Sequence, residues 1–111
     1  MFAHAGMLRW SVSTTGSDLD LTGIADPMID PLVPAGRALL ALTDAIVLRD
    51  EAERDAALDE LVPLVGTAGA VRAAAVVGNF EMMNRNLDGM GIGPSTASAA
   101  IAQDLGMPWP P

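Results

Sequence analysis

The stretch VRAAAVVGNFEMMNRNLDGMGI, from Val71 to Ile92, decides the fold expected of this chain. Five of its apolar residues recur at steps of four, three, four and three, which places them on one face of a helix: Val76, Phe80, Met83, Leu87 and Met90. Arg72, Asn79 and Asn86 form a second stripe, two helical turns apart each time. The stretch therefore predicts an amphipathic helix.

Glycine and proline set the expected boundaries of this helix and of its neighbours. Gly89 and Gly91 are natural C-terminal stops, so the long helix is predicted from about Ala68 to Gly89. An earlier helix is expected from Pro34 or Ala35 to Leu48, with its apolar stripe on Ala38, Leu39, Leu42, Ala45 and Ile46. Another is expected from about Asp50 to Leu61, ended by Pro63 and Gly66, with its apolar face on Ala52, Ala56, Leu58 and Leu61.

The two ends of the chain carry weaker patterns. Residues 1–17 form an N-terminal segment, a candidate for a disordered or remnant piece, with a helical turn or two up to Trp10 and a polar loop from Ser11 to Ser17. Residues 18–111 form the main domain, with one more short helix expected between Asp18 and Ile29. A short Ala-rich helix is expected from Gly93 to about Leu105, followed by an extended Pro-rich tail at 106–111. The predicted fold is all-α, a small helical bundle of four to five helices.

Composition narrows the classes of function. The chain has 111 residues, which suits one domain, and a formal net charge of −8, which argues against binding nucleic acid or an anionic membrane. It has no Cys, which excludes thiol-based redox chemistry and thiolate metal sites. We expect no apolar run of the length that spans a bilayer and no signal peptide, and therefore a cytoplasmic protein.

The run from Pro34 to Glu51, followed by an acidic helix and the ending NRNLDGMGI, resembles the C-terminal part of the AhpD-like, carboxymuconolactone decarboxylase-type family. Residues 37–46, RALLALTDAI, match the family's pattern of paired leucines before an Asp. Asn84, Arg85, Leu87 and the pair Gly91-Ile92 match its ending, with Met90 in a Leu position. The resemblance implies an AhpD-like helical arrangement and assembly into homo-oligomers.

The chain lacks the residues that carry out the chemistry of that family. Redox members carry a Cys-x-x-Cys helix with a nearby His and Glu, and the decarboxylase members carry an acid, an aromatic residue and a His there. This chain has no Cys and a single His, His4. It resembles a member without its active-site helix, either a truncated product or a half that completes a site on another chain.

Only weak candidates for catalysis remain. Arg85 with Glu81 suits the binding of a substrate carboxylate, but the favoured interpretation is a surface charge lattice that also includes Asp88. His4 is a candidate general base without a carboxylate or nucleophile at helical spacing. Candidate ligand-lining residues are Asn79, Met83 and Asn84, for which structural roles are the alternative.

No cofactor or metal is expected. The pairs Asp18 with Asp20 and Asp26 with Asp30 lack the ordered oxygens of a cation site, and they fit turns and helix caps better. Met82, Met83 and Met90 with Phe80 form either core, a flexible pocket or a dimer face. The chain has more apolar surface than so small a bundle buries, which favours a homo-oligomer.

The expected function is therefore that of a non-redox, catalytically silent AhpD-like protein, acting in assembly or small-molecule binding. The alternatives are a decarboxylase-type lyase or hydrolase that uses non-Cys residues, and a partner subunit that completes a site on another chain.

Overall fold

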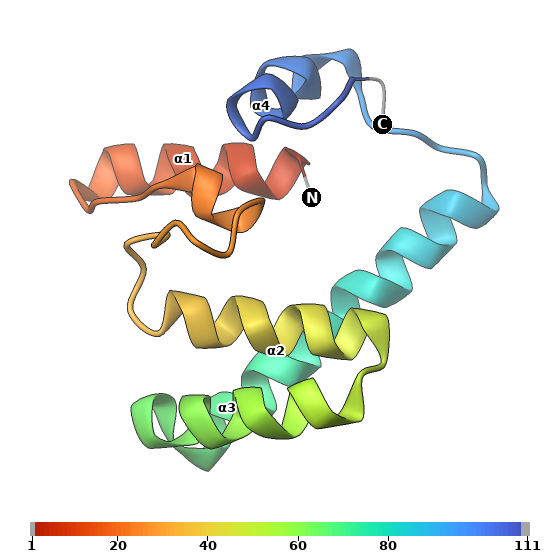
Figure 1. Ribbon diagram of the computed structural model, residues 1–111. Coiled ribbons are helices and arrows are strands. Elements are labelled where there is room, and N and C mark those ends of the chain that lie inside the picture. Colours follow the sequence, from red (N-terminus) through yellow and green to blue (C-terminus); the bar gives the residue numbers. More distant parts are fainter. Residues whose placement is uncertain (1, 110–111) are drawn as a thin grey trace. The chain divides into compact units, whose positions relative to one another are not determined.

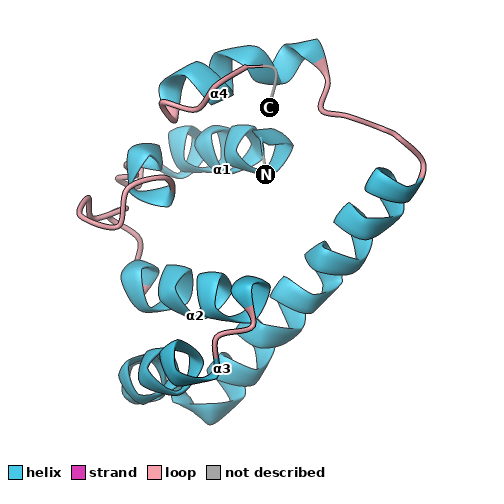
Figure 2. Cartoon of the chain, turned by 45° about the vertical axis from the view of Figure 1, so that its right-hand side comes forward, coloured by secondary structure: helices cyan, strands magenta, loops and turns pink. Residues whose placement is uncertain are grey.

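The protein is all-α. The computed structural model describes residues 2–109, and the side chains of residues 7–109. This part of the chain holds four α-helices and two short 3-10 helices, and no strand (Figures 1 and 2). The predicted all-α helical class is confirmed. The chain divides into two compact units: one combines the N-terminal part up to Pro34 with the chain from Pro94 onward, and the other is Ala35–Gly93.

In the first unit, helix α1 is Phe2–Thr15, so the polar loop predicted from Ser11 onward is wrong as far as Thr15. The hydroxyl groups of this segment bond back to the helix itself. Ser13 and Thr14 donate to the carbonyl of Trp10 at 2.7 and 2.9 Å. Such back-bonding gives both hydroxyls a partner within the helix, so this Ser/Thr-rich stretch is compatible with a helix. The helix ends at Gly16, whose φ is +71°.

The core of the first unit joins both ends of the chain. The 3-10 helix η1, Leu21–Ile24, supplies Leu21, and helix α4, Ala99–Asp104, which follows η2 at Thr96–Ser98, supplies Ala102 and the adjoining Leu105. Partly buried hydrophobic residues pack around these three: Leu19, Ile24, Ile101, Met107 and Trp109. The tail predicted to be extended thus packs, as far as Trp109, on this core.

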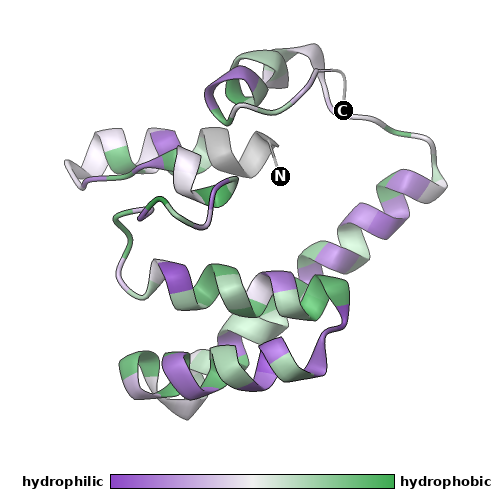
Figure 3. Cartoon of the chain, viewed as in Figure 1, coloured by the Kyte–Doolittle hydropathy of each residue, from purple (hydrophilic) through white to green (hydrophobic). Residues whose placement is uncertain are grey.

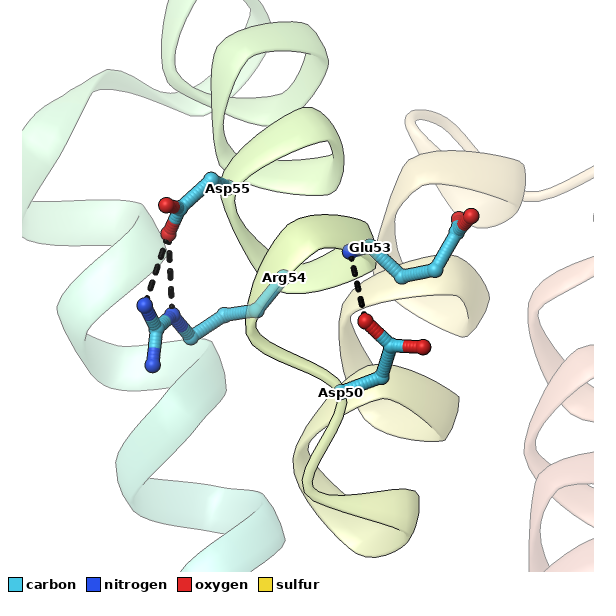
Figure 4. Close-up of polar contacts among 4 residues, drawn as sticks. All are labelled: Asp50, Glu53, Arg54 and Asp55. Carbon is cyan, nitrogen blue, oxygen red and sulfur yellow. Dashed lines mark hydrogen bonds and ion pairs between the residues drawn. The ribbon is translucent and has the colours of Figure 1, made fainter.

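The second unit is a helical hairpin with a long, kinked second arm. Helix α2 is Gly36–Leu48 and helix α3 is Glu51–Gly89, joined by Arg49 and Asp50. Arg49 takes the left-handed conformation at φ +59°, and the Asp50 carboxylate caps α3 by accepting from the Glu53 N–H at 3.0 Å (Figure 4). The short turn and the cap bring α3 back along α2.

Gly66 divides α3 into two helical segments, 51–65 and 67–89. Its φ of +75° and ψ of 165° lie in a region that glycine alone adopts readily. The two separate helices predicted here are confirmed in substance, although the first continues through Pro63 instead of ending before it. Figures 1 and 2 show that the later segment of α3 crosses α2 and then extends beyond it.

Small residues let the two arms of this unit approach closely. Its buried cluster consists of Ala38 and Leu42 from α2, with Ala57, Leu61 and Ala70 from α3. The predicted stripe of α2 is confirmed, because Ala38, Leu42 and Ala45 are buried and Leu39 and Ile46 are half-buried.

The predicted face of the 51–65 segment is wrong in part. Ala52 and Ala56 are exposed, and Ala57 is buried in their place. Ala57 lies four residues before Leu61 and therefore shares its helical face, whereas Ala56 lies five before it and points elsewhere.

Candidate functional site: the exposed face of α3

The later part of α3 carries five of the six candidate site residues and few buried side chains. From residue 74 to residue 89 the described side chains are exposed or half-buried, and the last fully buried residue of the helix is Ala70. We call the five residues of the amphipathic pattern the apolar row: Val76, Phe80, Met83, Leu87 and Met90. The side chains of Val76, Met83, Leu87 and Met90 are 53, 42, 42 and 73 % exposed, respectively, and Phe80 is half-buried.

Hydrophobic and hydrophilic residues lie side by side on this stretch. Figure 3 shows both colours along α3 beyond the point where it crosses α2. The charged residues Glu81, Arg85 and Asp88 lie about 120–180° around the helix from the row at 100° per residue. The row is therefore an apolar strip with its charges on the opposite side of the helix.

Arg85 and Glu81 form a surface ion pair. The Arg85 Nη2 lies 3.9 Å from the Glu81 Oε2, and the two side chains are 74 % and 32 % exposed. Asp88 makes no ion pair within residues 7–109. A long, exposed pair of this kind contributes about 0–1 kcal/mol. The geometry matches the surface charge lattice better than a pocket that holds a substrate carboxylate.

The other candidate residues have modest contacts. The Asn79 Nδ2 donates to the Met83 Sδ at 3.9 Å, a weak bond within one helix turn. Asn84 is exposed. The backbone of His4 lies in α1, and its side chain is outside the described residues. The structure thus places Asn79, Glu81, Met83, Asn84 and Arg85 along one stretch of α3, and none of them lines either of the two hollows described in the first unit.

The strongest charge interaction of α3 lies in its first segment. Both Nε and Nη2 of Arg54 donate to the Asp55 Oδ1, at 3.0 and 2.8 Å (Figure 4). The hydrogen bond to Asp55, and then its negative charge, raise the pKa of Arg54. Arginine is already protonated at any physiological pH, so this interaction changes no protonation state there. The positive charge of Arg54 partly offsets the run of acidic residues around Asp55.

Sequence reasoning missed a contact in the first unit. The Arg9 Nη1 lies 2.7 Å from the Asp104 Oδ2, at the edge of a hollow of about 470 Å³ that Asp18 and Asp20 also line. No local pattern signals this pair, because its members come from opposite ends of the chain. Arg9 is thus already paired with a carboxylate, and the other described residues that line this hollow carry no positive charge with which to attract an anion.

The acidic pairs behave as turn and cap residues. The carboxylates of Asp20, Asp26 and Asp30 each accept from the backbone N–H two residues later, at 3.0, 2.9 and 2.8 Å. Within the described residues there is no group of three His, Asp or Glu side chains that could hold a metal ion. These carboxylates stabilise the loop before α2.

Helix α3 is long enough and apolar enough to be a candidate membrane span, judged by its length and composition alone. This differs from the sequence-based expectation that no apolar run is long enough to span a bilayer, although the kink at Gly66 divides this helix into two segments. The test weighs length and composition only, so the cytoplasmic location stays a prediction.

Comparisons with protein-family models, with curated proteins and with solved structures find no match to this chain. The AhpD-like resemblance therefore stays a prediction, carried by the residues quoted for it.

Proposed function

We propose that this chain is a non-redox, catalytically silent helical protein of AhpD-like type, whose role is assembly through the exposed face of α3. The observation that carries the proposal is the apolar row, four of whose five side chains are more than 40 % exposed on one helix face. Contiguous apolar strips on a soluble helix mark interaction surfaces, because leaving them in water costs free energy.

The enzymatic alternatives have less support. Arg85 is solvent-exposed and Glu81 is half-buried, and within the described residues their only ion pair is the long one with each other at 3.9 Å. The stretch 71–92 also contains no Ser, Thr, Cys or His to act as a nucleophile or base beside them. A carboxylate-binding role for Arg85 would need a concave site around it, and the hollows described in the protein are lined by the first unit.

A lipid surface fits this face less well than a protein partner does. The kink at Gly66 interrupts the helix within its apolar part, and Arg72 lies six residues further on. A broken backbone and a charged side chain are both costly in hydrocarbon. A protein surface tolerates both, because the Arg72 head group stays in water.

Two adjacent methionines provide a matched test. Met83 belongs to the apolar row, whereas Met82 is exposed on another face of the same helix. We expect sedimentation equilibrium to find an oligomer for the unmodified chain and for Met82→Glu, and a weaker or absent oligomer for Met83→Glu. A carboxylate buried against an apolar partner is strongly unfavourable, which is the reason for the difference.

Circular dichroism of both variants controls for loss of helix. A monomeric unmodified chain at all concentrations tested would contradict the proposal, and so would equal effects of the two substitutions.

A further inference from the structure

The apolar row belongs to a regular pattern that begins three residues before Val76, at Ala73. With Ala73 added, its residues are spaced alternately three and four apart: Ala73, Val76, Phe80, Met83, Leu87 and Met90. This is the spacing of the a and d positions of a coiled coil, in which side chains of one helix fill the gaps of another. Ala73 packs on the core of the second unit, and the row runs outward from it onto the exposed part of α3. The spacing points to another helix as the occupant of this face.

The charges around the row suit a copy of the same helix. One of the residues that flank the row, Arg72, is charged. The other flanking residues are uncharged: Val77, Asn79, Asn84, Asn86 and Gly91. Across residues 71–92, Arg72 and Arg85 balance Glu81 and Asp88, in a chain whose net charge is −8. Two copies can therefore approach along this stretch without the like-charge repulsion that the rest of the chain would produce.

Resting on the proposed assembly function, we infer that two copies pair antiparallel along this row, with Val76 facing Leu87 of the second copy and Phe80 facing its Met83. In this register Ala73 faces Met90 of the second copy, so the smallest side chain lies opposite a long and flexible one. A parallel pair in register would place Ala73 against Ala73 and Met90 against Met90, leaving a gap at one end and crowding at the other.

The acidic part of α3 favours the same orientation. Residues 50–60 contain Arg54 and six acidic residues: Asp50, Glu51, Glu53, Asp55, Asp59 and Glu60. A parallel pair would place both acidic segments at one end of the interface. An antiparallel pair places them at opposite ends of a row that is about 25 Å long at 1.5 Å per residue, beyond the screening length of physiological salt.

Disulfide trapping tests the register, and the absence of Cys from the chain removes any background. The double variant Val76→Cys/Leu87→Cys cannot close a bond within one chain, because its sites are about 16 Å apart along the helix and a disulfide needs Cα atoms within about 7 Å. Under mild oxidation we expect a covalent dimer on a non-reducing gel, reversed by dithiothreitol. The single variants Val76→Cys and Leu87→Cys should remain largely uncrosslinked.

The double variant Gly78→Cys/Arg85→Cys is the matched control, since both sites lie on the helix side opposite the row and a side chain at Gly78 meets nothing within 4 Å. It should crosslink about tenfold more slowly or less, because its thiols have no high effective concentration across the interface.

Sedimentation of the unmodified chain separates the possible failures. If the chain is an oligomer but Val76→Cys alone crosslinks as fast as the double variant, the pair is parallel and the inference is wrong, while the assembly proposal stands. If the chain is an oligomer and the Gly78→Cys/Arg85→Cys control crosslinks fastest, another face of α3 pairs and the register is again wrong. If the chain is a monomer at all concentrations tested, both the inference and the assembly proposal fail.

Discussion

At the scale of single residues, two neighbouring leucines with similar sequence surroundings differ in how far they are buried. Leu61 and Leu64 stand one turn apart in the same segment of α3, yet Leu61 is fully buried in the α2–α3 cluster and Leu64 is exposed. Both are leucines in an apolar neighbourhood, LVPLV, and periodicity alone gives no strong reason to separate them. Leu61 is the buried one because it packs against Ala38 and Leu42 of α2.

This difference predicts the effects of two alanine substitutions. Leu61→Ala removes a buried side chain from between two packed helices and should lower the free energy of unfolding by about 2–5 kcal/mol. Leu64→Ala, made one turn away, should change it by no more than about 0.5 kcal/mol. Urea unfolding followed by circular dichroism at one fixed protein concentration measures both. Equal losses would show that the α2–α3 cluster is not the core of this unit.

At the scale of elements, the most consequential feature is the break in α3. Gly66 redirects the helix after its first segment has packed on α2, so the later segment projects with its apolar row in the open. The proline and the glycine were sufficient to predict two helices here. The direction of the second helix depends on the backbone angles of Gly66, which no local pattern of side chains specifies.

Two glycine substitutions test this role. Gly66→Ala places a Cβ on a backbone at φ +75°, which should cost about 1–3 kcal/mol of stability or straighten the helix. Gly78→Ala, in regular helix with open space around it, should instead stabilise the protein by about 0.5–1 kcal/mol. Thermal unfolding of the two variants, compared at equal concentration, distinguishes the outcomes. A stabilising Gly66→Ala would mean that the kink is not a fixed feature of the fold.

At the scale of the whole molecule, charge and exposed apolar surface act against one another. A net charge of −8 makes copies of the chain repel one another, whereas the neutral stretch 71–92 is the face on which we propose that they meet. The chain contains no Cys and therefore has no thiolate for thiol peroxidase chemistry.

This balance predicts how salt affects association. Raising NaCl shortens the range of the repulsion between the acidic chains, while the apolar contact is left intact or strengthened. The Kd of self-association, measured by sedimentation velocity over a salt series, should therefore fall as salt rises. Met83→Glu should remain largely monomeric throughout the series. A Kd that rises with salt would indicate an interface held by ion pairs and would contradict an apolar one.

The sequence by itself determined the local features of this protein. The helix of α2, the two helical segments of α3 and the turn roles of Asp20, Asp26 and Asp30 follow from periodicity and from the conformational limits of glycine, proline and short polar side chains, which act over a few residues. The apolar row was visible for the same reason.

Only the tertiary structure decided which of these features meet. It buried Ala57 where Ala56 was expected, and it joined the N-terminal part to α4 through Leu21, Ala102 and the pair of Arg9 with Asp104. It also left the apolar row of α3 uncovered while burying the stripe of α2. These outcomes depend on contacts between residues far apart in the chain, and such contacts leave no periodic trace in the sequence.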